Sequence, residues 1–80
     1  MSLNLVFLGR LADAAGEGER KVSTVPSIAA LIAGLEPELS AALGSPKVKI
    51  AVNGKIVSDR AIFTLRDGDE VAFLPPVSGG

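Results

Sequence analysis

The residues of this sequence that could do chemistry lie at its end, Pro75-Pro76-Val77-Ser78-Gly79-Gly80. Glycine has no Cβ, so a carboxylate that follows two glycines can enter a narrow channel in another protein. A free carboxylate is a poor electrophile until another enzyme converts it to an acyl-adenylate. The activated carbonyl can then accept sulfur or be joined to an amine. The ending therefore predicts that the working group is the carboxylate of Gly80.

The two prolines before this ending indicate how the carboxylate is presented. Proline has no amide donor and cannot continue a central ladder, so a strand should end at Leu74. Consecutive prolines favour a stiff, extended segment, and residues 75–80 can reach at most ~20 Å. A flexible end is the default for any chain, but a terminal Gly-Gly arises by chance in only about one sequence in 200. A strand, a stiff spacer and two glycines in this order favour a functional tail at 75–80.

The residue types that the sequence lacks exclude several kinds of site. There is no cysteine, histidine, tyrosine or tryptophan, so the commonest general base, the thiol nucleophile and the usual zinc ligands are missing. An enzyme would have to use Asp, Glu, Lys, Ser or Thr alone. We therefore expect a protein that is not an enzyme on its own, with no metal site and no bound cofactor.

The charge and hydropathy patterns exclude two classes of partner. Eight basic and nine acidic residues are interspersed along the chain, so we expect no nucleic acid as partner. The longest apolar stretches, such as residues 5–8, are too short to span a bilayer, and the first residues do not resemble a signal peptide. We expect no membrane association. The absence of cysteine fits a cytoplasmic protein.

The first half of the chain predicts two strands and a helix. The apolar run Leu3–Leu8 is typical of a strand whose odd positions face the core. A loop with a possible helical turn follows, and a weaker strand is expected over 19–25. Ser27 is a helix N-cap, because apolar residues recur behind it at helical spacing. These are Ile28, Leu31, Ile32 and Leu35.

The second half predicts a short helical turn and a set of strands. The turn runs over 37–43 and precedes a half-buried strand at 48–52. Asn53-Gly54 is a strong hairpin signal, because both residues tolerate positive φ, and 55–57 form the returning strand. After a turn at 67–69, the last strand covers 70–74.

This order of elements predicts one α+β domain over residues 1–74, followed by the tail at 75–80. It matches the β-grasp, or ubiquitin-like, arrangement. We expect a mixed sheet of four to five strands with one main helix packed on one face. In this arrangement the first and last strands pair in parallel at the centre of the sheet.

Several large apolar residues fall at positions that should point away from the helix. Val6 and Leu8 lie on the first strand, Ile56 on the hairpin and Leu74 on the last strand. Leu8, Ile56 and Leu74 could join in an exposed apolar patch, the kind of surface that often binds a partner. The alternative is that loops cover these side chains or that they are scattered exposures.

The segment 67–80, with its Pro-Pro-Val-x-Gly-Gly ending, closely resembles the end of the small subunit of molybdopterin synthase, a member of the MoaD/ThiS-type sulfur-carrier family. Ala51-Val52-Asn53-Gly54 is similar to the middle hairpin of that family, and residues 5–8 are similar to its first strand. The resemblance covers essentially the whole chain, and the ending is its most specific part.

The resemblance implies a β-grasp fold and a sulfur carrier of molybdenum cofactor biosynthesis. An adenylating (E1-like) enzyme would activate the terminal carboxylate with ATP, and a sulfur donor would convert it to a thiocarboxylate. The tail would then enter the large subunit of molybdopterin synthase and give sulfur to cyclic pyranopterin monophosphate.

Carried onto this sequence, the resemblance assigns the thiocarboxylate to Gly80 and the threading of the tail to Gly79. The partner surface of the family corresponds to Leu8, Ile56 and Leu74. The tail residues that would bind the partner are Pro75, Pro76 and Val77. Arg10 and Lys55 are candidates for polar contacts at the edge of this surface.

Other functions share much of this pattern. A sulfur carrier of the thiamine pathway has the same fold, Gly-Gly end and chemistry, although its tail does not usually carry Pro-Pro. Carriers for cysteine synthesis or tRNA thiolation are further possibilities. From a different class, the chain could be a ubiquitin-like modifier joined to lysines, or an interaction module in which the tail has no role.

Overall fold

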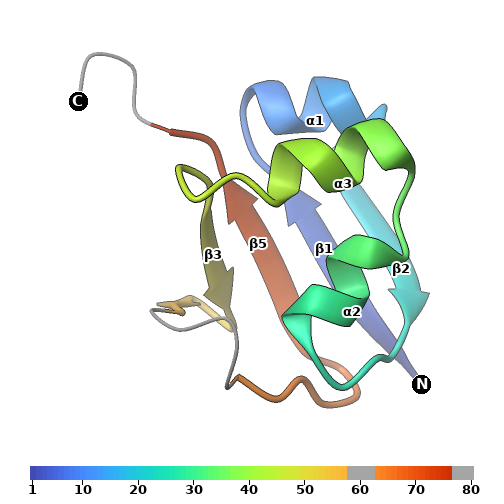
Figure 1. Cartoon of the computed structure of the whole chain (residues 1–80). Helices are drawn as coiled ribbons and strands as arrows, with labels where there is room; N and C mark the ends of the chain where they lie inside the picture. The colour runs from blue at the N-terminus through green and yellow to red at the C-terminus, as the bar shows by residue number, and fades with distance from the viewer. Residues whose placement is uncertain (58–62, 77–80) are drawn as a thin grey trace.

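A computed structural model describes residues 1–57 and 63–76 of the chain. These residues form a five-stranded sheet with the strand order β2-β1-β5-β3-β4 (Figure 1). The strands are β1 (Ser2–Phe7), β2 (Glu19–Ser23), β3 (Lys49–Val52), β4 (Lys55–Ile56) and β5 (Glu70–Leu74).

The two central strands run parallel to each other. Leu5 of β1 is level with Val71 of β5, and Phe7 is level with Phe73. The other strand pairs are antiparallel. Because β1 and β5 point the same way, both end at the same edge of the sheet. This arrangement confirms the predicted α+β class and the β-grasp fold.

Helices cover one face of the sheet (Figure 1). The described residues form three of them, and all three are short. These are α1 (Arg10–Ala15), α2 (Ile28–Ala33) and α3 (Pro37–Leu43). The sequence predicted a main helix behind Ser27 and a short helical turn over 37–43, and the structure confirms both as α2 and α3. The chain leaves α2 at Gly34, and Pro37 begins α3, because proline fits the first turn of a helix but not its interior. The predicted cap at Ser27 is confirmed, since its Oγ accepts a hydrogen bond from the Ala30 amide at 3.0 Å.

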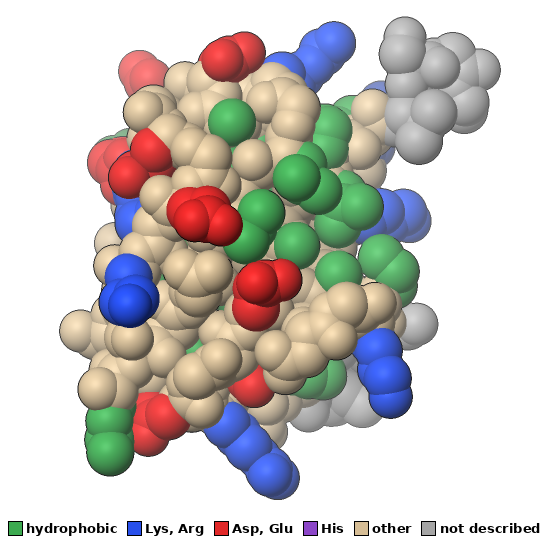
Figure 2. Space-filling model, turned by 180° about the vertical axis from the view of Figure 1, so that it is seen from behind, with side chains coloured by type: hydrophobic (Ala, Val, Ile, Leu, Met, Phe, Trp, Pro, Cys, Tyr) green, Lys and Arg blue, Asp and Glu red, His purple; other side chains and the backbone are tan. Residues whose placement is uncertain are grey.

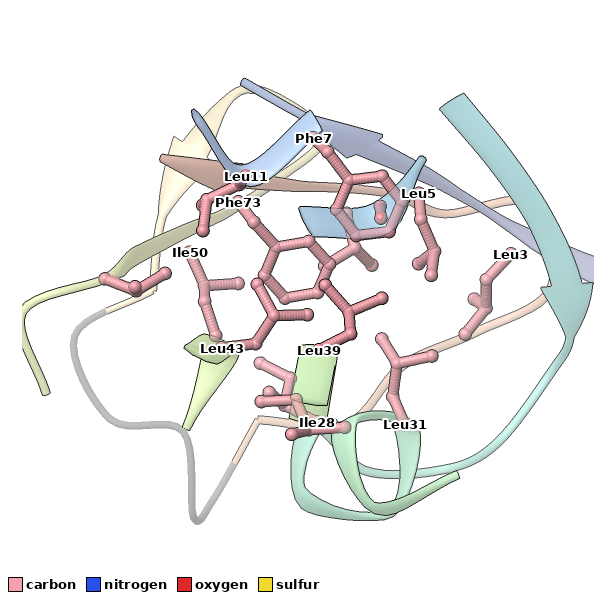
Figure 3. Packing of buried hydrophobic residues seen from close by; sticks show 14 of the residues in the cluster. Leu3, Leu5, Phe7, Leu11, Ile28, Leu31, Leu39, Leu43, Ile50 and Phe73 are labelled. Atoms are coloured by element: carbon pink, nitrogen blue, oxygen red, sulfur yellow. The ribbon is translucent and has the colours of Figure 1, made fainter. Parts of the chain in front are cut away.

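The core lies between the sheet and this helical layer. The odd positions of β1 are buried, as the alternation predicted. The rings of Phe7 and Phe73 stack at the centre, with centroids 5.6 Å apart. Figure 3 shows these rings among leucine and isoleucine side chains from the helices and β3. One continuous cluster therefore fixes the strands in register. Among the described residues, no helix lies on the opposite face of the sheet.

Candidate functional site

The last described residues form the root of the tail. Strand β5 ends at Leu74, Pro75 is half-buried and Pro76 is exposed. The Pro75 ring lies against the turn between β1 and α1, where Gly9 has no side chain. A Cβ at Gly9 would lie 3.0 Å from Pro75 Cγ. The predicted site residues Val77, Gly79 and Gly80 lie outside the described residues.

Apolar side chains occupy the face of the sheet that the helices leave uncovered, which we call the open face. Strand register aligns Val6, Ala72, Ala51 and Ile56 in one row across four strands. Next to this row, Leu8 follows β1 and Leu74 ends β5, and the Leu8 amide donates to the Phe73 carbonyl at 3.1 Å. The open face therefore consists of Val6, Leu8, Ala51, Ile56, Ala72 and Leu74.

Two of these side chains are strongly exposed. Leu8 is 41 % exposed and Ile56 is 57 % exposed. Leu74 is half-buried, and Ala51 is buried among its neighbours. Seen from behind, hydrophobic side chains gather on this face, with acidic and basic groups around them (Figure 2). Large exposed aliphatic side chains in one patch are typical of a binding surface.

Charged residues of both signs lie around the open face. On β2, Glu19 is level with Val6 and Lys21 is level with Asn4. Glu70 begins β5, and on the opposite side Lys49 of β3 is level with Leu74. All four side chains are exposed. The apolar centre is therefore bordered by a mixed set of charges, as is common at the rim of a binding surface.

A network of hydrogen bonds holds the β3–β4 hairpin against the start of β5. Asn53, at φ 52°, donates from Nδ2 to Asp69 Oδ1 at 2.9 Å, and its Oδ1 accepts from the Glu70 amide at 3.0 Å. Asp69 Oδ2 also accepts from the Arg66 amide at 2.9 Å. The bond from Asn53, followed by that from Arg66, lowers the pKa of the Asp69 carboxyl below its usual range. This network fixes the hairpin that carries Ile56.

The structure therefore brings together the predicted site residues that it describes. Leu8 and Leu74 are neighbours on one face, Ile56 lies on the same face, and Pro75 and Pro76 follow directly from β5. Arg10 begins α1, and Lys55 begins β4, both exposed.

Sequence reasoning assigned no role to three residues of this region. Ala51 and Ala72 form the centre of the open face, and Gly9 contacts the root of the tail. The alternation of β3 placed Ala51 away from the core, but a small side chain does not indicate whether its face is covered. Gly9 gives no signal of the Pro75 contact, because the two residues meet only through the parallel pairing of β1 and β5.

Two further features, a metal-binding cluster and a membrane-spanning helix, are absent from the described part of the chain. Residues 1–57 and 63–76 contain no group of three or more Asp, Glu, His or Cys side chains that could hold a metal ion. None of the helices in these ranges is long and apolar enough to cross a membrane.

Several known proteins are similar to this chain in sequence or in structure. The chain is 34 % identical to the molybdopterin synthase sulfur carrier subunit of Escherichia coli, over 98 % of this chain and 99 % of that protein. It superimposes on one chain of a complex of subunits 1 and 2 of the molybdopterin-converting factor from Helicobacter pylori. That match has a TM-score of 0.71 and 28 % identity, and covers all of both chains.

A second solved structure is also similar. The small archaeal modifier protein 1 from Methanosarcina acetivorans superimposes with a TM-score of 0.80 at 26 % identity, over 99 % of this chain and 96 % of that one. Residues 5–80 match the model of the ThiS family. The chain therefore belongs to the ThiS family, within the MoaD/ThiS-type sulfur carriers that its sequence resembles.

Proposed function

We propose that the chain is the sulfur carrier of molybdenum cofactor biosynthesis, acting as the small subunit of molybdopterin synthase. One observation carries the proposal: the apolar open face borders the point where β5 leads into a sequence that ends in Gly79-Gly80. A surface that docks a partner and a segment that can enter it are thus joined. The 34 % identity to the sulfur carrier subunit from E. coli supports this reading.

The proposed chemistry takes place on the carboxylate of Gly80. An E1-like adenylating enzyme joins this carboxylate to the AMP portion of ATP and releases pyrophosphate. A sulfur donor then displaces AMP, so that a C–S bond replaces the C–O bond to AMP and a thiocarboxylate forms. In molybdopterin synthase this sulfur passes to cyclic pyranopterin monophosphate, and the carboxylate returns when water supplies the oxygen.

The chain itself contributes the carrier, and its partners contribute the acid and base groups. It lacks histidine and cysteine, so it is not an enzyme on its own in this proposal and holds no cofactor. Gly79 allows the tail to thread, and the large subunit binds Leu8, Ile56, Leu74 and the segment Pro75–Val77. The reactions would take place in the cytoplasm.

Intact mass spectrometry tests the proposal directly. The purified chain is incubated with a competent adenylating enzyme, ATP and a sulfur source. The expected result is a mass gain equal to the exchange of one oxygen for sulfur. A chain that lacks Gly80 is the matched control and should gain nothing. If the full chain also gains nothing while a known carrier is converted in the same mixture, the sulfur-carrier proposal is wrong.

The archaeal relative favours a second candidate function, that of a protein modifier. The solved structure from M. acetivorans is named as a modifier protein and superimposes over nearly all of this chain. The same acyl-adenylate would then react with a lysine amine to form an isopeptide bond. Isopeptide-linked adducts in cells, absent when Gly80 is deleted, would support this function. Because residues 5–80 match the ThiS family, a sulfur carrier of the thiamine pathway is a variant of the first proposal. The two carriers differ in the molecule that accepts the sulfur, so identifying the acceptor distinguishes them.

A further inference from the structure

We propose that Gly9 is a positioning residue for the C-terminal tail. The absence of a side chain at Gly9 lets the ring of Pro75 lie against the turn between β1 and α1. That contact sets the direction in which the chain leaves β5. The effect on tail reactivity rests on the proposed function, whereas the effect on tail direction depends on the contact alone.

The backbone of Gly9 is held on both sides. The preceding amide, that of Leu8, bonds to the Phe73 carbonyl, and the Gly9 carbonyl accepts from the Ala12 amide at 3.1 Å in the first turn of α1. Between these bonds Gly9 has φ 55° and ψ −135°. This lies outside the left-handed helical region that other residues occasionally visit, so the turn requires glycine.

The contact with Pro75 adds a second requirement. A Cβ at Gly9 would lie 3.0 Å from Pro75 Cγ and 3.8 Å from Cδ. Both atoms belong to a ring that cannot rotate away as a flexible side chain can. The distance to Cδ is an ordinary contact, but the distance to Cγ is too short, so an L-residue at this position would require the Pro75 ring to shift by a few tenths of an ångström away from the turn.

Other glycines with positive φ do not share this feature. At Gly16, Gly54 and Gly68 an added Cβ would meet nothing within 4 Å. At these three positions the positive φ of the turn is sufficient reason for a glycine. Among the described glycines with positive φ, Gly9 alone contacts the tail. Gly16, at the other end of α1, is thus a natural control.

The direction of the tail matters because Pro75 and Pro76, at its root, follow directly from Leu74 of the open face. The ring of proline fixes φ at about −65°, so the position of the Pro75 ring determines the direction of the backbone at Pro75. When a partner covers the open face, the carboxylate is then delivered from one side. Such preorganisation raises the rate of a reaction without changing the docking surface.

The direction of the tail can be measured without any enzyme. Because the chain has no cysteine, Lys21→Cys on β2 and Ser78→Cys in the tail accept two spin labels. Pulsed electron spectroscopy then gives the distribution of distances between them. Gly9→Ala should shift or broaden this distribution, whereas Gly16→Ala should leave it unchanged.

Pro75→Ala tests the same contact from the other residue, because it removes Cγ and leaves Gly9 unchanged. It should also broaden the distribution, and it remains informative if Gly9→Ala does not fold. An unchanged distribution in the folded Gly9 variant, or in the Pro75 variant, would overturn the proposal.

The kinetic test uses the adenylating enzyme with the full chain. Gly9→Ala should lower kcat for adenylation about tenfold with an unchanged KM, and Gly16→Ala should behave as wild type. A rise in KM with an unchanged kcat would assign Gly9 to docking and contradict a positioning role. If the wild-type chain is not adenylated at all, the proposed function fails, and the label distances still decide the role of Gly9.

Discussion

Side-chain size at single positions determines the shape of the open face. Ala51 and Ala72 lie between the larger Val6 and Ile56 in one row, so the middle of the face is low and the two ends stand out. Ile56 is the more exposed of these, at 57 %. A protruding aliphatic side chain beside a shallow apolar centre fits a complementary pocket in a partner.

Replacing Ile56 by aspartate should therefore separate binding from folding. The side chain is exposed, so the free energy of unfolding should change by no more than about 0.5 kcal/mol. The affinity for the large subunit should fall by about tenfold or more, because a charge would be buried against an apolar pocket. Isothermal titration calorimetry with the large subunit measures this.

The matched control is Ala29→Asp, which introduces the same charge at an exposed position of α2 on the other side of the molecule. It should bind as wild type. Equal losses of affinity in both variants would mean that net charge, rather than the open face, governs binding.

The residues of the site were predictable to different degrees for physical reasons. Alternation along a strand identified Leu8, Ile56 and Leu74, because a large apolar residue at an outward position is unusual. Gly9 could not be found in this way. Its contact with Pro75 joins residues distant in sequence, and the parallel pairing that brings them together was inferred from the order of the elements, which does not say which side chains meet at the ends of the strands.

At the scale of whole elements, the helix behind Ser27 is shorter than its apolar spacing predicted, and the helical turn predicted over 37–43 is a helix of its own. Helix α2 contains only the first part of that pattern and ends before Leu35. Helix α3 then supplies Leu39 and Leu43, which are both buried. Helices of this length are not stable alone, so their ends and their packing decide whether they form. Capping predicted the start of α2 correctly, and Pro37 explains why α2 cannot continue into α3.

The cap at Ser27 should carry a measurable part of the stability. Ser27→Ala removes the acceptor for the Ala30 amide and should cost about 1 kcal/mol in the free energy of unfolding. Ser27→Asp keeps an acceptor and should recover most of that loss. Urea denaturation followed by circular dichroism measures both. If the alanine and aspartate variants were equally destabilised, a role other than capping would be required for Ser27.

At the scale of the whole molecule, Arg20 joins parts of the chain that the sheet alone does not connect. From β2 it donates to the Ala15 carbonyl at the end of α1, to Glu17 and to Glu36 between α2 and α3. Its guanidinium also lies over the Phe7 ring, 5.7 Å from the centroid. The hydrogen bonds to Glu36 and Glu17 raise the pKa of Arg20, and the bond from Arg20 lowers the pKa of Glu36.

This cluster predicts a loss of stability in acid. Because the pKa of Glu36 is lowered by folding, its contribution is present at neutral pH and is lost as the pH falls below about 4. Glu36→Gln should lower Tm at pH 7, and the difference from wild type should vanish near pH 2. Glu19→Gln, at an exposed position of β2, should leave Tm unchanged at both pH values. A constant difference between the Glu36 variant and wild type across this range would show that the charge is not responsible.

The central position of β5 has a consequence for how the protein is made. This strand is the last of the described strands to be synthesised, yet it lies between β1 and β3 and joins them. A nascent chain that has not reached residue 74 therefore contains two separate hairpin-like halves with no common sheet. The domain can close only after β5 has left the ribosome. Chains that terminate before residue 70 would therefore lack the strand that joins the two halves and could not fold into this domain.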